Sequence, residues 1–156
     1  MNSSSQIQEI LSYAENNCKS RGTRLTDKRK KILSGLLQSG KAMSAYELVD
    51  YCKQQNGKSI PPMSVYRILD FLQDEGLIHK LDSAKKYIAC AHITCDHEHG
   101  VPQFLICSKC QQVEEITVSK STIAHLKHNV EKAGFHLVSS QLEINCLCGH
   151  CKNELT

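Results

Sequence analysis

The sequence predicts an α+β protein, with an N-terminal winged helix-turn-helix domain followed by a small α/β domain that holds a four-cysteine zinc site. Three observations lead to this prediction. Apolar residues recur at helical spacing in the first part of the chain, an alternating hairpin pattern follows, and two Cys-x-x-Cys pairs lie in the remainder. We expect residues 1–90 to form the first domain, 91–103 a hinge and 104–156 the second domain.

Composition divides the chain in the same way. Residues 1–86 carry 14 Lys and Arg against 9 Asp and Glu, whereas residues 87–156 carry 5 against 7. The second part also holds 7 of the 8 histidines and 7 of the 9 cysteines. A basic part followed by a ligand-rich part indicates a polyanion-binding module joined to a metal-binding one.

No signal peptide and no apolar run of membrane-spanning length is visible, so we expect a soluble, cytoplasmic protein with no membrane partner. Nine cysteines in a cytoplasmic chain favour metal binding over disulfides. The core of the first domain is expected to include Cys18 and Cys52, because nothing near either residue in the sequence would bind a metal with it.

Helix signals organise the first domain. Apolar spacing from Ile7 predicts a helix that ends near Gly22, and Thr26 can cap the next helix. Ser44 and Glu47 form a capping box, Ser-x-x-Glu, at the start of a third helix that stops near Gly57. The basic run 28–31 is either a solvated face or a face near phosphates.

A fourth helix is predicted over residues 62–75, with Val65, Ile68, Leu69 and Leu72 facing inward. Alternation at 78–81 and 87–90 around the polar turn 82–86 predicts a β-hairpin. Helices followed by a hairpin make a winged helix-turn-helix, which places its last helix in the major groove of double-stranded DNA.

Side chains off the apolar stripe of that helix are the candidate DNA contacts. Arg67 can reach guanine or a phosphate, and Tyr66 a thymine methyl or a backbone oxygen. Tyr46, at the start of the preceding helix, can reach the backbone or a base edge. For both tyrosines a half-buried aromatic is a real alternative.

The cysteine pairs carry the strongest chemical signal. Cys107 and Cys110 form one Cys-x-x-Cys, and after 37 intervening residues Cys148 and Cys151 form another. This is the spacing by which four thiolates converge on one tetrahedral zinc, and such a closed site has no position for catalysis. A redox dithiol or two disulfides are the alternatives, but a redox motif would be single and tied to a helix start.

The rest of the second domain is expected to pair strands around the first cysteine pair, at 104–107 and 113–117. Ser119 should cap a helix with Ile123, Leu126 and Val130 inward, and residues 135–144 should form a third strand. Cys146 is surplus to a full four-thiolate set, so we expect no ligand role for it.

Taken together, these motifs resemble the ferric uptake regulator family, and within it the zinc uptake regulator branch. The resemblance covers about residues 7–151 and includes Arg-x-Thr-x-x-Arg, Ser-Val-Tyr-Arg-Ile-Leu, Leu-Ile-His-Lys and the repeated Cys-x-x-Cys. It implies a homodimeric, metal-responsive repressor whose C-terminal domain dimerises around a structural zinc. It also implies that Arg24 enters an AT-rich minor groove.

The resemblance further implies a second, regulatory zinc between the domains, giving two zinc ions per protomer. Its pattern falls on His79, Cys90, Glu115 and one hinge histidine. We expect His99, eight residues before Cys107, with His97 as the alternate. His92 and Cys95 are less favoured ligands. A mixed nitrogen, thiolate and carboxylate set suits zinc better than iron or manganese.

The predicted function is therefore a zinc-loaded dimer that binds operator DNA and represses zinc-uptake genes, with no substrate other than the metal ion. The alternatives are a sensor of another metal or of peroxide in the same family, a structural zinc-ribbon adaptor and, remotely, a zinc hydrolase. An enzyme is not expected, because no separate acid or base accompanies the candidate ligands.

Overall fold

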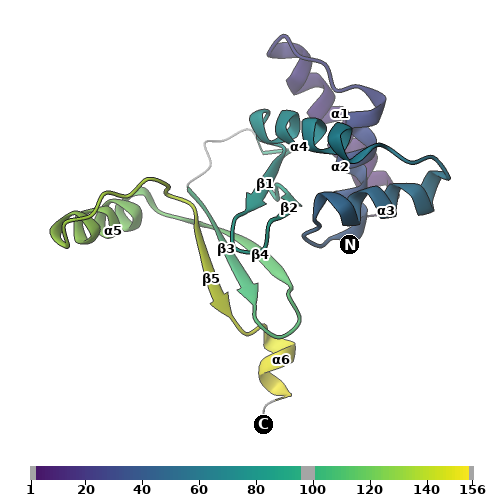
Figure 1. The fold of residues 1–156 in the computed structure, drawn as a ribbon. Helices are drawn as coiled ribbons and strands as arrows, with labels where there is room; N and C mark the ends of the chain where they lie inside the picture. The colour runs from purple at the N-terminus through teal and green to yellow at the C-terminus, as the bar shows by residue number, and fades with distance from the viewer. Residues whose placement is uncertain (1–2, 96–100, 155–156) are drawn as a thin grey trace. The chain divides into compact units, whose positions relative to one another are not determined.

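The computed structural model describes residues 3–95 and 101–154, and the chain divides into two compact units, Met1–Cys95 and Asp96–Thr156 (Figure 1). Within the described residues, the first unit holds four helices and a hairpin, and the second holds a three-stranded sheet with two helices. This mixed composition, together with the cysteine cluster described below, confirms the predicted α+β fold class.

The helices of the first unit begin where the sequence supplies caps. Ser3, Thr26 and Ser44 each accept a hydrogen bond from the backbone N–H three residues on, and Ser3 and Ser44 form full capping boxes with Gln6 and Glu47. The four helices are α1 (Ser4–Ser20), α2 (Asp27–Ser39), α3 (Ala45–Asn56) and α4 (Pro62–Asp74).

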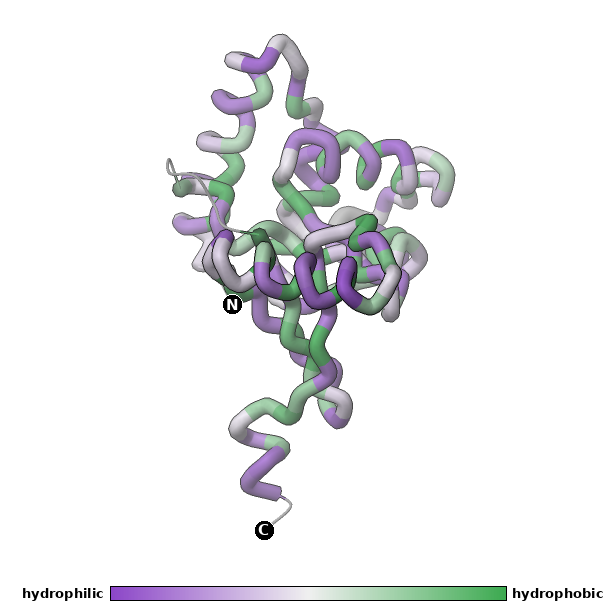
Figure 2. The backbone as a smooth tube through the Cα atoms, turned by 90° about the vertical axis from the view of Figure 1, so that its left-hand side faces the viewer, coloured by the Kyte–Doolittle hydropathy of each residue, from purple (hydrophilic) through white to green (hydrophobic). Residues whose placement is uncertain are grey.

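One apolar core joins these helices to the hairpin. The inward stripe expected for α4 is buried, with Val65, Leu69 and Leu72 fully enclosed. Cys18 and Cys52 are also buried, and burial raises the pKa of both thiols, so they behave as core side chains. Figure 2 shows apolar and polar segments alternating along the helices, as amphipathic helices require.

The hairpin pairs β1 (Ile78–Leu81) with β2 (Lys86–Ala89) in antiparallel register, with His79 opposite Ile88. It is fastened to the helices by a bridge in which Met43 and Tyr87 exchange backbone hydrogen bonds of 2.9 and 2.8 Å. Together with the helices it completes the predicted winged helix-turn-helix.

The second unit is built on the sheet order β4-β3-β5. β3 pairs antiparallel with β4 and parallel with β5, and the connection from β3 to β5 contains both β4 and α5. The parallel pair of β3 and β5 needs such a long connection because a tight turn cannot join parallel strands. The elements are β3 (Val101–Cys107), β4 (Val113–Val118), α5 (Lys120–Lys132), β5 (Leu142–Cys146) and α6 (Gly149–Asn153).

The third strand lies later in the chain than the sequence predicts. Residues 135–141 have no regular structure, and β5 begins at Leu142, where pairing with Gln103 starts. Gln103 fixes this entry because its buried side chain accepts a hydrogen bond from Leu142 N at 2.7 Å and donates one to Ser140 O at 2.9 Å. The prediction of a strand over 135–144 is therefore wrong in its first seven residues.

Helix α5 of this unit also differs from expectation, because its apolar residues are less buried than predicted. Ser119 caps α5 as predicted, but Ile123, Leu126 and Val130 are only half-buried, and no residue of α5 is fully buried. Phe135 and Val138 beyond it are 73% and 93% exposed. A single chain therefore leaves this apolar surface largely uncovered over its described residues.

Segments next to the expected hinge belong to the two units. Ile93 packs in the core of the first unit, and β3 already begins at Val101.

Helix α6, which starts at the second cysteine pair, was not expected at all. A five-residue helix is too short for apolar spacing to indicate it.

Candidate metal centre and nucleic-acid interface

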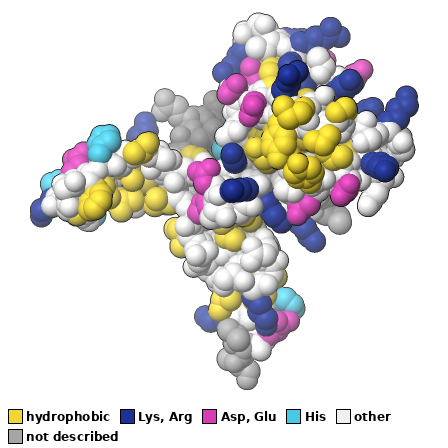
Figure 3. Space-filling model, viewed as in Figure 1, with side chains coloured by type: hydrophobic (Ala, Val, Ile, Leu, Met, Phe, Trp, Pro, Cys, Tyr) yellow, Lys and Arg dark blue, Asp and Glu magenta, His cyan; other side chains and the backbone are white. Residues whose placement is uncertain are grey.

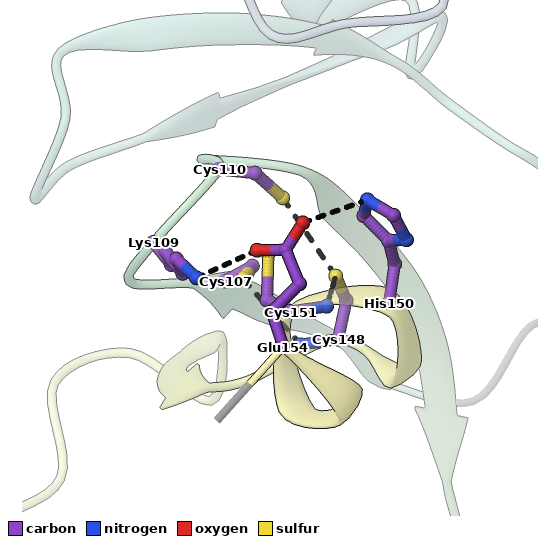
Figure 4. A network of polar contacts seen from close by, with 7 residues as sticks. All are labelled: Cys107, Lys109, Cys110, Cys148, His150, Cys151 and Glu154. Carbon is purple, nitrogen blue, oxygen red and sulfur yellow. Dashed lines mark hydrogen bonds and ion pairs between the residues drawn. The ribbon is translucent and has the colours of Figure 1, made fainter. Parts of the chain in front are cut away.

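Four cysteines of the second unit converge on one point (Figure 4). Cys107 ends β3, Cys110 lies in the turn that follows, Cys148 is the N-cap residue of α6 and Cys151 lies within that helix. All four Sγ atoms lie within 4.8 Å of one another, and those of Cys110 and Cys148 are 3.7 Å apart. These are the four cysteines that the sequence singles out.

The spacing of the sulfur atoms fits a tetrahedral zinc ion. Zinc–thiolate bonds of about 2.3 Å place sulfur atoms about 3.8 Å apart in a tetrahedron. A disulfide would instead bring two sulfurs to about 2.05 Å, and all nine cysteines are free thiols. The residues present therefore fit zinc by donor type, number and separation.

Backbone N–H groups support the sulfur atoms. Cys148 N donates to Cys107 Sγ at 3.4 Å, and Cys151 N donates to Cys148 Sγ at 3.5 Å. Backbone hydrogen bonds from Cys110 and Cys148 lower the pKa of Cys107 to about 6, whereas burial and then the neighbouring sulfurs raise the pKa of Cys151 to about 12. Complete ionisation of the cluster thus calls for a cation to offset the crowded negative charge.

A polar bridge links the two cysteine turns in Figure 4. Glu154 accepts from Lys109 Nζ at 2.6 Å and lies 3.3 Å from His150 Nε2. Lys109 stands between the first two cysteines, and His150 between the second two. These exposed contacts contribute little free energy singly, but they connect the two halves of the site.

Cys146 lies beside this cluster without belonging to it. It is paired in register with Cys107, and its backbone carbonyl accepts hydrogen bonds from Ser108 N at 2.9 Å and Ser108 Oγ at 3.3 Å. The four-sulfur group does not include Cys146. Its visible contribution is to hold the first cysteine turn through the main chain.

Two of the predicted regulatory ligands lie together in the first unit. His79 is on β1 and Cys90 directly follows β2, where its N–H donates to Leu77 O at 2.9 Å. Their ligand atoms are within 4.8 Å of each other. Hairpin pairing explains this proximity. His79 lies opposite Ile88, and Cys90 comes two residues after Ile88, so Cys90 is a diagonal neighbour of His79 across the two strands.

The remaining candidates lie elsewhere in the chain. Glu115 is on β4 in the second unit, opposite Phe104 in the ladder. His97 and His99 are outside the described residues. Of the less favoured ligands, Cys95 Sγ lies 3.9 Å from His92 Nδ1 in the turn after the hairpin.

The predicted DNA contacts are all exposed side chains of the first unit. Arg24 lies between α1 and α2, while Arg67 and Tyr66 are on α4. Tyr46, at the start of α3, is 64% exposed and makes an edge-to-face contact with Tyr66, with ring centroids 6.5 Å apart. The alternative that these tyrosines are half-buried core aromatics therefore does not fit Tyr46.

Sequence reasoning did not single out Met63, on the first turn of α4, which is 67% exposed. It is the third large apolar side chain exposed among the described residues of the first unit, with Tyr46 and Tyr66. Figure 3 shows an apolar cluster on one face of this unit, with Lys and Arg side chains and some Asp and Glu side chains around it. Exposed apolar groups beside cations suit base edges and phosphates together.

Comparison with known proteins places this fold and these cysteines in a family. The profile of the ferric uptake regulator family matches residues 20–145. The chain belongs to the ferric uptake regulator family. It is 36% identical over 145 residues to the zinc uptake regulation protein of Escherichia coli strain K12, with 92% of this chain and 82% of that protein covered. It is 32% identical to the ferric uptake regulation protein of Synechococcus elongatus, covering 86% and 90%.

Solved structures of the family agree with this assignment. A zinc uptake regulator complexed with zinc and DNA has a TM-score of 0.81 at 29% identity, with 99% of each chain covered. Holo XcZur has a TM-score of 0.76 at 33% identity, covering 93% of this chain and 98% of that one. Within the described residues, no helix of this family member combines the length and apolarity needed to cross a membrane.

Proposed function

We propose that this chain is a zinc-responsive transcriptional repressor that binds operator DNA as a zinc-loaded dimer and controls zinc-uptake genes in the cytoplasm. The observation that carries the proposal is the combination, in one chain, of a winged helix-turn-helix with a clustered four-cysteine site. A zinc uptake regulation protein and a zinc uptake regulator bound to DNA are among the similar proteins, which supports zinc and DNA as the ligands.

The first zinc of each protomer would be structural. Cys107, Cys110, Cys148 and Cys151 would hold it, and four thiolates leave no open position for a substrate. The ion would supply folding free energy to the second unit, because the cysteine turns sit at the ends of β3 and β5, whose pairing holds the sheet together.

The second zinc would be regulatory, held by His79, Cys90, Glu115 and a hinge histidine, His99 in preference to His97. The closeness of His79 and Cys90 in the hairpin supports this assignment from the side of the first unit. The set offers nitrogen, sulfur and oxygen donors, which zinc accepts in tetrahedral sites. Such a site would take ligands from both units of the chain.

Regulation then follows from linkage. A metal that binds ligands from both units favours the arrangements in which those ligands meet, and it can shift the population by no more than its differential affinity. A shift from 1:99 to 99:1 needs about 10⁴-fold tighter binding to the favoured state. Zinc would in this way select the arrangement in which the two recognition helices of a dimer match two half-sites.

A homodimer is supported by the uncovered apolar surface of the second unit. The half-buried face of α5 and the exposed Phe135, Val138 and Ile144 are apolar groups that a second copy can cover. A two-fold dimer also presents two copies of α4, as palindromic operators require.

The alternatives are a sensor of another metal or of peroxide within the family, and a zinc hydrolase. A ferric uptake regulation protein is also among the similar proteins, so the family alone does not choose the metal. The thiolate of Cys90 favours zinc. A hydrolase is disfavoured because a fourth ligand from Glu115 would close the site.

The test is a metal titration read out by DNA binding. Duplexes selected from a random library by the wild-type protein would be titrated at buffered concentrations of zinc, iron(II) and manganese. Sharp zinc-dependent binding without hydrolytic turnover is expected. The highest DNA affinity with iron or manganese would make the chain a sibling sensor, and no binding at any metal concentration would refute the repressor function.

A further inference from the structure

The segment that carries Arg24, residues 21–29, contacts the recognition helix α4 and its C-cap residue at both ends. At one end Arg21 Nη1 donates to Glu75 O at 3.3 Å and lies 3.6 Å from the Glu75 carboxylate, just beyond α4. At the other end Arg29, on the first turns of α2, lies with its guanidinium carbon 3.6 Å from the ring centroid of Phe71 on α4. Residues 22–28, between these two contacts, are too few for the segment to move far from α4.

Arg29 also holds the Arg24 residue itself. Its Nη1 donates to the backbone carbonyl oxygen of Arg24 at 2.6 Å. One planar guanidinium thus stacks on α4 with its face and binds the segment with its edge, a pairing that the planar fork of arginine permits and a lysine ammonium does not reproduce. Leu25 is buried next to this point, which anchors the segment further.

We propose that Arg29 is a positioning residue for DNA recognition, which fixes Arg24 relative to α4 so that a minor-groove contact and a major-groove helix meet one operator in a set register. This inference rests on the proposed function. Arg24 is exposed and its own side chain is left to reach DNA, while Arg29 is half-buried and occupied by Phe71 and Arg24. Because the segment is already fixed in the free protein, less conformational entropy is lost when it binds DNA.

The competing explanation is that Arg29 itself contacts a phosphate. In that case its removal would lower the salt slope of binding by about 1, and its effect would be independent of Arg24. A positioning residue behaves differently, because its effect disappears when the side chain it positions is absent. A double-mutant cycle between Arg24 and Arg29 separates the two explanations.

The experiment uses the full-length, zinc-loaded protein and a duplex selected by the wild type. Arg29→Ala and Arg24→Ala should each lower affinity about tenfold, while Arg29→Ala in the Arg24→Ala background should change it by less than about twofold. Lys28→Ala is the matched control, since it removes an equal charge from the same turn without touching Phe71. Its effect should multiply with that of Arg24→Ala.

A minor-groove probe supplies a readout that a loss of stability alone would not move. Replacing adenine by 2,6-diaminopurine under the segment adds an amino group to the minor groove and leaves the major-groove pattern of adenine in place. The wild type should lose affinity for this duplex, and Arg29→Ala should be nearly insensitive to the change. Phe71→Leu keeps the charge of Arg29 but removes its platform, so it should behave like Arg29→Ala.

Melting temperature and zinc content of every variant are measured alongside, and binding is compared where all are folded dimers. Fold-losses that multiply for Arg24→Ala and Arg29→Ala, with full diaminopurine sensitivity in Arg29→Ala, would overturn the positioning role alone. A wild-type protein that selects no duplex at any zinc concentration would instead overturn the proposed function on which the inference rests.

Discussion

The Sγ atoms of Cys110 and Cys148 lie 3.7 Å apart, although 38 positions separate these residues along the chain. Strand pairing brings them together, because Cys107 and Cys146 are in parallel register at the ends of β3 and β5. Pairing of the strands in the sheet therefore places the two cysteine pairs next to each other. In return, a zinc ion across the two pairs would close the long loop that contains β4 and α5.

Cys107→Ser should remove zinc from this site and unfold or dissociate the second unit. Structural zinc contributes about 10–16 kcal/mol of apparent binding free energy in zinc-finger peptides at pH 7, so losing one thiolate has a large effect. Zinc content, circular dichroism and sedimentation check this. Cys146→Ser is the matched control and should keep zinc and fold. A folded dimer with full zinc in Cys107→Ser would refute the assignment.

The four-cysteine site should lose zinc more steeply as pH falls below about 6. Its thiols must be deprotonated to bind zinc, so protons compete with the metal and affinity falls with pH. Cys107, with a pKa of about 6, is already largely ionised at pH 7, so protons compete strongly with zinc for its thiolate only below about pH 6. Cys151, with a pKa of about 12, releases its proton on binding throughout this range. Competition with a chromophoric chelator from pH 8 to pH 5 measures the effect, and a flat profile would contradict it.

Cys90→Ser should keep the structural zinc and the dimer but lose zinc-dependent DNA binding. Cys90 lies beside His79 in the hairpin and far in sequence from the four-cysteine cluster, so the two sites should fail separately. Zinc stoichiometry and the midpoint of the zinc titration of DNA binding provide the measurement. Cys95→Ser is the control and should respond like the wild type.

The hinge ligand is decided by a second comparison. His99→Ala should shift the zinc midpoint to higher concentration by more than His97→Ala does, because the resemblance favours His99. A larger shift in His97→Ala would exchange the two assignments, and a wild-type response in Cys90→Ser would place the regulatory site elsewhere.

The sequence predicts best where the physics is local. The caps at Thr26 and Ser44 and the stripe from Val65 to Leu72 depend on spacing within a few residues, and the structure has them where expected. The four cysteines are predictable for a related reason, because a metal tolerates few spacings of its ligands.

Prediction is weaker where partners are distant. Residues 135–141 have the apolar content of a strand, yet they do not join the sheet, because β3 pairs with its parallel neighbour only from Leu142 onward. Gln103, which sets this start, lies 39 residues away and gives no local signal. The role of Arg29 is equally hidden, since its contacts with Arg24 and Phe71 exist only once α2 and α4 have packed.

Leu126→Glu should convert the protein from dimer to monomer. Leu126 lies in the middle of the half-buried face of α5, where a second copy would bury it, and a carboxylate there loses its hydration without a partner. The dimer dissociation constant should rise at least about tenfold, measured by sedimentation. Lys127→Glu, on the exposed side of the same turn, is the control. An unchanged dimer in Leu126→Glu would exclude α5 from the interface.

Arg67→Ala should weaken binding to the selected operator by about 1–3 kcal/mol if Arg67 reads a base, and should flatten discrimination at one position. Arg67 is exposed on α4, off the buried stripe, where its guanidinium can reach N7 and O6 of guanine. A phosphate contact would instead weaken all duplexes alike and lower the salt slope by about 1. Every variant is compared fully zinc-loaded, so that lost metal is not mistaken for a lost contact. If Arg67→Ala binds the operator as the wild type does at physiological salt, α4 is not the recognition helix and the DNA-binding half of the proposal fails.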